Sequence, residues 1–311
     1  MPLLSQLFFY VKTTAMHHSI YSKPAMLAMA LVCLFFSAFT QPVLYGKTER
    51  QALESAPYSE WFYPGYTNYH PDKKLVSQLK SQNIHQLKVE IWLGTWCGDS
   101  KREVPRFFKL LDTAGFKPEQ IVIYSLGGAD SLYKQSPGHE EAGKGIFRVP
   151  VFIVYRGEKE IGRINEYPVW SLEKDLLQII SGKPYTPNYK SFALIKEWLQ
   201  ERELEQENIS ARGLAGMLRP LIAQEYELNS LAYLLMRQGD NKNALKIFQV
   251  NAQLYPASPL TLAGLAEGFL KNGYYDLAIS YSEYALENNT NAPAVKGILK
   301  ILYAAWEEKG R

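Results

Sequence analysis

The stretch EIWLGTWCGDSKREVPRF, residues Glu90–Phe107, decides the fold because a buried-strand pattern changes there into an amphipathic-helix pattern. Leu87–Leu93 is rich in β-forming residues, and Pro105–Ala114 carries apolar residues at helical spacing. Cys97 lies at the junction, where unpaired amide groups and the helix dipole favour negative charge. The position therefore predicts a reactive thiolate. The alternative is an inert buried cysteine, and the neighbouring Asp99 carboxylate opposes ionisation.

The sequence around this junction alternates between helix and strand. Lys73–Gln82 and Trp170–Ile180 have the spacing of helices, and Gln120–Leu126 has the pattern of a buried strand. Val149–Ile164 contains two apolar runs around a turn at Arg156–Gly157, which predicts a β-hairpin. Strand, helix and strand at this spacing predict a right-handed βαβ unit with parallel strands.

Three motifs in this region resemble the thioredoxin family. They are WCGDS (Trp96–Ser100) after a strand, KREVPRF (Lys101–Phe107) with a proline inside the following helix, and RVPVFIVYRGEKEIGRI (Arg148–Ile164). The resemblance covers Leu75–Gly182 and implies a cis Val149–Pro150 peptide bond against the active-site cysteine. The site residues that it implies are Cys97 as the catalytic thiol, surrounded by Trp96, Gly98, Asp99, Ser100, Val149 and Pro150.

The chain departs from the thioredoxin pattern at two positions. Oxidoreductases of the family use C-x-x-C, in which the second cysteine resolves the mixed disulfide, and Ser100 stands at that second position. The acidic residue expected six positions before the nucleophile is Ile91, and Glu90 is expected on the opposite face of the strand. A dithiol cycle within this chain is therefore excluded. Three roles stay open for the domain: monothiol exchange, covalent capture of a client, and binding alone. Whether the chain is an enzyme therefore also stays open.

The sequence after the linker at Gly182–Tyr189 is almost wholly helical in pattern. Helices are also expected within Leu214–Ala223 and Ala292–Trp306, at the two ends of a repeated segment. Similar residues recur at a spacing of 34 within that segment, as in Leu231 and Leu265, Ala232 and Ala266, Gly239 and Gly273, and Ala244 and Ala278. The segment resembles tetratricopeptide repeats, which implies a concave surface for a protein partner. The alternative is that these helices pack on the first domain or pair two chains.

The N-terminus has the pattern of an export signal. Ala25–Phe39 is uncharged, follows Lys23, and is shorter than the roughly 20 apolar residues that a membrane-spanning helix needs. A cleaved signal over residues 1–40 is expected, and an uncleaved anchor is the alternative. Cleavage would leave Cys97 alone in an oxidising compartment such as the bacterial periplasm, so no internal disulfide would form.

Composition bounds the remaining function classes. The formal net charge is +3 and no basic run is present, which argues against a nucleic-acid partner. The five histidines and two cysteines have no metal-ligand spacing, and no cofactor-binding motif is present. The expected partners are a client or redox-partner protein, bound through Cys97 and the repeat surface, and glutathione or another small thiol. The sequence thus predicts an α/β thioredoxin-like fold followed by an all-α repeat domain. The expected parts are a signal at 1–40, an extension at 41–72 that packs on the first domain, the thioredoxin-like domain at 73–184 and the helical repeat domain at 190–311.

Overall fold

A mixed five-stranded sheet forms around β2 (Leu87–Leu93), whose bounds are those predicted from the sequence. The strand order is β1-β3-β2-β4-β5, with β1 at Gly46–Thr48, β3 at Ile121–Ser125, β4 at Val151–Arg156 and β5 at Lys159–Asn165. β2 is parallel to β3 and antiparallel to β4, and β4 and β5 form the predicted hairpin. The sequence did not predict β1, which pairs antiparallel with β3.

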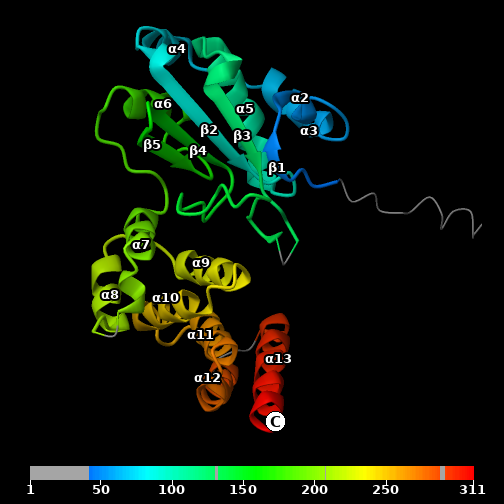
Figure 1. Cartoon of the computed structure of the whole chain (residues 1–311), viewed down its shortest axis with the longest axis vertical. Helices are drawn as coiled ribbons and strands as arrows, with labels where there is room; N and C mark the ends of the chain where they lie inside the picture. Colours follow the sequence, from blue (N-terminus) through cyan, green and yellow to red (C-terminus); the bar gives the residue numbers. More distant parts are fainter. Residues whose placement is uncertain (1–41, 130–131, 207, 288–290) are drawn as a thin grey trace, which may run out of the picture. The chain divides into compact units, whose positions relative to one another are not determined.

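This computed structural model describes residues 42–129, 132–206, 208–287 and 291–311. The signal expected at 1–40 therefore lies outside the described residues. Within them, helices surround the sheet, and the C-terminal region is built from helices (Figure 1). The chain is thus broadly α/β with a helical C-terminal region, as the sequence predicts at that level.

Helix α5 (Gly98–Ala114) joins the two parallel strands β2 and β3. It ends at Gly115, whose φ of 94° is a left-handed conformation that glycine adopts without steric cost. Phe107 and Leu111 on its inner face are fully buried. They pack with the β2 side chains of odd number, from Leu87 to Leu93, in the main core of the sheet. The alternation of β2 thus places its even-numbered side chains on the other face.

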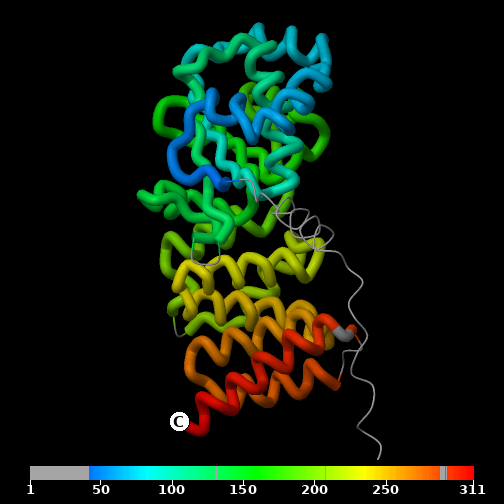
Figure 2. Tube along the Cα trace, turned by 90° about the vertical axis from the view of Figure 1, so that its right-hand side faces the viewer, coloured from blue at the N-terminus to red at the C-terminus, as the bar shows by residue number. Residues whose placement is uncertain are grey.

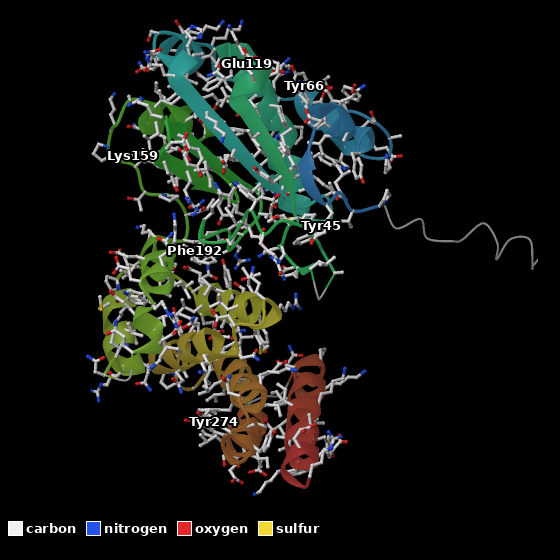
Figure 3. The ribbon with its side chains drawn as sticks, viewed as in Figure 1. Tyr45, Tyr66, Glu119, Lys159, Phe192 and Tyr274 are labelled. Atoms are coloured by element: carbon white, nitrogen blue, oxygen red, sulfur yellow. The ribbon has the colours of Figure 1, made fainter. Side chains whose placement is uncertain are left out.

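The segment before the first predicted helix also packs on this core. The Phe62 ring is fully buried and its centroid lies 5.7 Å from that of Phe108 on α5. The Tyr66 hydroxyl donates a hydrogen bond to Asp112 of α5 at 2.7 Å (Figure 3). Tyr63 of the same segment, by contrast, is 48% exposed. The helices of this region are α2 (Arg50–Leu53), α3 (Ser59–Thr67) and α4 (Lys73–Lys80), and α6 (Leu172–Ile180) follows the hairpin.

The helices of the C-terminal region follow one another in antiparallel fashion along the chain (Figure 2). Gly239 and Gly273 lie at two of the bends, with φ of 85° and 79°. Ala232 and Ala266, which the spacing of 34 places at equivalent positions, are fully buried between helices. The helices are α7 (Ser191–Gln200), α8 (Ala211–Leu218), α9 (Tyr226–Arg237), α10 (Asn241–Leu254), α11 (Pro259–Lys271), α12 (Tyr275–Glu287) and α13 (Ala292–Lys309).

Candidate functional site

Cys97 occupies the N-cap position of α5, directly after the turn that ends β2. The residue is half-buried, and its Sγ atom lies 3.3 Å from the backbone carbonyl oxygen of Val149, to which the thiol donates a hydrogen bond. The Val149–Pro150 peptide bond is cis, in agreement with the sequence expectation. The structure therefore brings together the cysteine and the proline segment, which are about fifty residues apart in the sequence.

The other residues of the WCGDS motif differ in exposure. Gly98 is exposed, whereas Ser100 is fully buried and its Oγ accepts a hydrogen bond from the Gly94 amide at 3.2 Å. The position that the resemblance to thioredoxins assigns to a second cysteine thus carries a hydroxyl that stabilises the turn before Cys97. Asp99 forms a 2.8 Å ion pair with Arg102, which offsets the negative charge beside the thiol.

Trp96 is held between two glycines. A Cβ atom added at Gly94 would lie 2.6 Å from Trp96 Cε2, and one added at Gly128 would lie 2.6 Å from Trp96 Cδ1. Such distances are too short for a real contact, so only glycine fits at both positions. The indole Nε1 donates a hydrogen bond to the Leu126 carbonyl oxygen at 3.0 Å, which fixes the ring beside the half-buried thiol.

A buried lysine, Lys134, lies in the segment between β3 and β4 that leads to Val149. Its side chain is only 5% exposed, and its Nζ donates a hydrogen bond to the Phe147 carbonyl oxygen at 2.8 Å. Burial, with Arg148 adding to it, lowers the pKa of Lys134 to about 7. The charges of Glu166 and of an ionised Cys97 act in the opposite direction. The sequence analysis missed Lys134, because a lysine in a Gly- and Ser-rich segment looks like an exposed loop residue.

The same segment is attached to the sheet by a buried ion pair. Glu90 is 4% exposed and lies on the face of β2 opposite to Ile91, as predicted. Its Oε2 accepts hydrogen bonds from Lys144 Nζ at 2.9 Å and from the hydroxyl of Tyr155 at 3.2 Å. Burial pushes the pKa of Glu90 up, but the hydrogen bond and charge of Lys144 outweigh it and hold that pKa below its usual value.

The helical region contributes side chains to the surroundings of the thiol. Arg148, the residue before Val149, donates a hydrogen bond to Ser230 of α9 at 2.8 Å. The Arg237 guanidinium of α9 lies 4.6 Å from the ring centroid of Tyr133, and that ring lies 5.2 Å from the Trp96 ring. These contacts could not be predicted from a local sequence pattern, since they join loop residues to one face of a distant helix.

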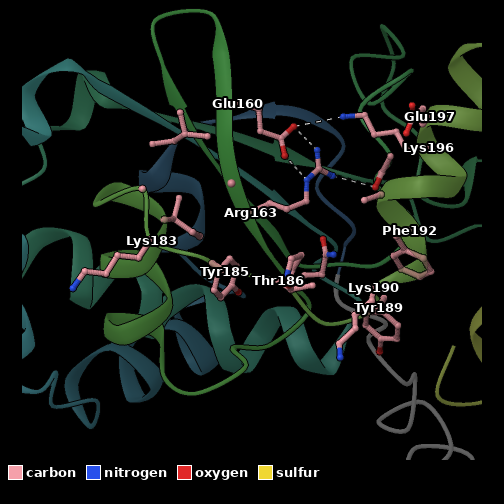
Figure 4. A pocket seen from close by; sticks show the side chains of 18 of the residues that line it. Glu160, Arg163, Lys183, Tyr185, Thr186, Tyr189, Lys190, Phe192, Lys196 and Glu197 are labelled. Carbon is pink, nitrogen blue, oxygen red and sulfur yellow. Dashed lines mark hydrogen bonds and ion pairs between the residues drawn. The ribbon is translucent and has the colours of Figure 1, made fainter. Parts of the chain in front are cut away.

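Two cavities formed by the described residues are not lined by Cys97. One, of about 660 Å³, lies along β5 and is bounded by the segment before α7 and by α7 (Figure 4). There Arg163 forms an ion pair with Glu160, which also pairs with Lys196 of α7 (Figure 4). A second cavity of about 510 Å³ lies between residues 135–147 and helices α7 and α9. Neither is lined by the thiol, so neither is the site that the sequence predicts.

Searches for other kinds of site and for relatives gave no match. The described residues contain no group of three or more His, Cys, Asp or Glu side chains placed to hold a metal ion. Among the described helices, none has the length and apolar character needed to cross a membrane. No protein-family model matches the chain, and the searches of curated proteins and of solved structures found no match either.

Proposed function

We propose that the chain is an exported thioredoxin-like protein that uses Cys97 alone for thiol–disulfide exchange or for covalent capture of a client. The observation that carries this proposal is the placement of a half-buried thiol at the start of α5, 3.3 Å from the carbonyl oxygen that precedes cis Pro150. The order β3-β2-β4-β5, with one parallel and two antiparallel pairs, supports a thioredoxin-like fold.

The proposed reaction is a single exchange. The Cys97 thiolate attacks one sulfur of a disulfide, forms a mixed disulfide with it, and releases the other sulfur as a thiolate. A second thiol from outside the chain must then attack the mixed disulfide to regenerate Cys97. Ser100 cannot do so, because its hydroxyl has no redox chemistry and is engaged with the Gly94 amide. The adduct at Cys97 is therefore long-lived unless such a thiol is supplied.

We also propose that helices α9–α13 form a tetratricopeptide-type array that binds the protein partner. Equivalent alanines are buried at the helix contacts, and glycines with positive φ occupy two of the bends. A groove of about 620 Å³ is lined by residues of α9, α11 and α13, among them Tyr233, Glu267 and Gly297. This groove has a volume suited to side chains of a bound peptide.

The test of the thiol chemistry is the mass of the folded protein after reaction with oxidised glutathione. In a Cys33→Ser background the protein should gain one glutathione, which dithiothreitol removes, and the added change Cys97→Ser should leave it with none. An unmodified wild-type protein under conditions that modify a free peptide thiol would contradict the proposal. That result would favour the alternative function, an adaptor in which both regions only bind. The presence of Ser100 where a resolving cysteine would stand supports that alternative.

The partner surface is tested by filling the groove. A Cβ at Gly297 or at Gly216 of α8 meets no atom within 4 Å, so both accept larger side chains. Gly297→Trp should abolish disulfide-linked protein adducts of Cys97 but leave its glutathione adduct intact. Gly216→Trp, a matched change outside the groove, should leave both. Equal protein adducts in the two variants would contradict the assignment of the groove.

A further inference from the structure

We propose that Lys134 is a specificity-determining residue, whose ammonium group makes the thiol site at Cys97 selective for thiol reagents and disulfides that carry negative charge. This inference rests on the proposed thiol chemistry and names its substrate class, of which oxidised glutathione, with its carboxylates, is a representative. Lys134 is one of the few charged side chains in the described residues that are almost fully buried, and its 2.8 Å hydrogen bond to Phe147 holds it in place.

Lys134 is linked to the thiol site through the chain segment that carries Val149 and through the ring of Tyr133. Phe147, whose carbonyl oxygen accepts the ammonium hydrogen bond, lies two residues before Val149, whose carbonyl oxygen contacts the Cys97 Sγ. Lys134 Nζ lies 5.1 Å from the ring centroid of Tyr133, and that ring packs on Trp96 beside the thiol. The backbone of Lys134 has a φ of 55°, and its amide donates to the Gly127 carbonyl oxygen at 2.9 Å.

Cations and anions both act electrostatically on Lys134. The charged and titratable groups that act on it are Arg148, Glu166, Cys97 and Arg237, together with the ring of Tyr133. Arg148 and Glu166 lie 3.9 Å apart and largely offset each other. An ionised Cys97 and the Lys134 ammonium attract each other, and because Lys134 is buried this charge acts more strongly than it would in water. An incoming anion is attracted to the same region.

The pH range of the selectivity follows from burial. The pKa of Lys134 is lowered to about 7, chiefly by burial, so the side chain is charged at pH 6 and largely neutral at pH 8.5. Selectivity for anions should therefore fall across neutral pH. An exposed lysine would keep its charge over this whole range.

The experiment compares an anionic and a neutral alkylating reagent on the folded full chain carrying Cys33→Ser, so that Cys97 is its one thiol. The rates of Cys97 modification by iodoacetate and by iodoacetamide are measured from pH 6 to 8.5, and their ratio is taken at each pH. The fraction of ionised thiol cancels in this ratio, so the ratio reports the local charge. In wild type the ratio of the iodoacetate rate to the iodoacetamide rate should fall by about three- to tenfold between pH 6 and 8.5. This is the size of effect that one nearby charge has on the reaction rate of an anion at an intermediate dielectric constant.

Three variants separate charge from structure. Lys134→Met should have the low ratio at every pH, and Lys134→Arg should have the high ratio at every pH because arginine stays protonated. Lys109→Met is the matched control, since it removes a lysine that lies over the ring of Tyr66, and its profile should equal that of wild type.

Two results overturn the inference. They are a wild-type ratio that does not change with pH, and a Lys134→Met ratio equal to that of wild type at pH 6. The wild-type profile stays decisive even if a variant fails to fold. If folded wild-type Cys97 reacts with neither reagent, the proposed thiol chemistry fails together with the inference, whereas a flat ratio on a reactive thiol overturns the inference alone.

Discussion

Replacing Lys144 by methionine should lower the stability of the protein by removing the main partner of the buried Glu90. The carboxylate is 4% exposed and accepts the Lys144 Nζ hydrogen bond at 2.9 Å. A hydrogen bond to a charged group contributes about 1.5–3 kcal/mol, and the 30% exposure of the Lys144 side chain reduces that figure. We therefore expect a loss of about 1–2 kcal/mol in the free energy of unfolding at pH 7.

Lys88→Met is the matched control for this change. Lys88 contacts the other oxygen of Glu90 at 3.4 Å, but its side chain is 49% exposed, so its loss should cost under about 0.5 kcal/mol. Urea unfolding at pH 7, followed by circular dichroism, measures both variants. Equal losses in the two variants would refute the reasoning, because burial and distance would then not decide the strength of the ion pair.

The pH dependence gives a second check on the same pair. The pKa of Glu90 in the folded protein lies below its usual value, so the ion pair contributes its full stability above the pKa of an unfolded glutamate. That contribution is lost as the pH falls through the lower, folded value. The difference between wild type and Lys144→Met should thus be constant from pH 6 to 7 and shrink below about pH 4. A difference that grows on acidification would contradict the assignment.

Two further changes test the geometry of the thiol site. Ser100→Cys places a second thiol one helical turn from Cys97, within the range that a disulfide spans. The variant should therefore form an internal disulfide, which mass spectrometry detects as the loss of two hydrogens. A variant that keeps the glutathione adduct as long as wild type does would contradict this placement. Gly128→Ala forces a methyl group into the Trp96 ring and should cost about 1–3 kcal/mol in urea unfolding. Gly98→Ala is the control, because a Cβ at Gly98 meets no atom within 4 Å, and it should leave the free energy of unfolding unchanged. Equal losses of stability in the two variants would show that Trp96 is not confined by Gly128.

The elements of the fold were predictable wherever the apolar pattern is regular. Leu87–Leu93 is rich in β-forming residues, and β2 has these bounds. The helix pair around Gly239 is marked by its repeat spacing and by a glycine that the bend requires. β1 at Gly46–Thr48 was not predictable, because a three-residue edge strand has too few residues to show a period.

The candidate site was predictable only in its backbone. The position of Cys97 follows from the strand-to-helix junction, which is a local signal, whereas the cis bond before Pro150 and its place near Cys97 were expected from the resemblance to thioredoxins. Lys134 is different, since its burial depends on an irregular segment that folds back onto the site and shows no periodicity. The contact between Arg148 and Ser230 likewise joins two regions 82 residues apart, so no local pattern encodes it.

The most direct test of the proposed function is the mass of the folded chain after incubation with oxidised glutathione, measured beside Cys97→Ser. The structure leaves the thiol half-exposed at the start of α5. With Cys33 replaced by serine in both proteins, the chain that keeps Cys97 should carry one glutathione that a reductant releases, and the Cys97→Ser variant none. Wild-type protein that remains unmodified until it is unfolded in urea would contradict the account, because Cys97 would then be a packing residue and not a reactive thiol.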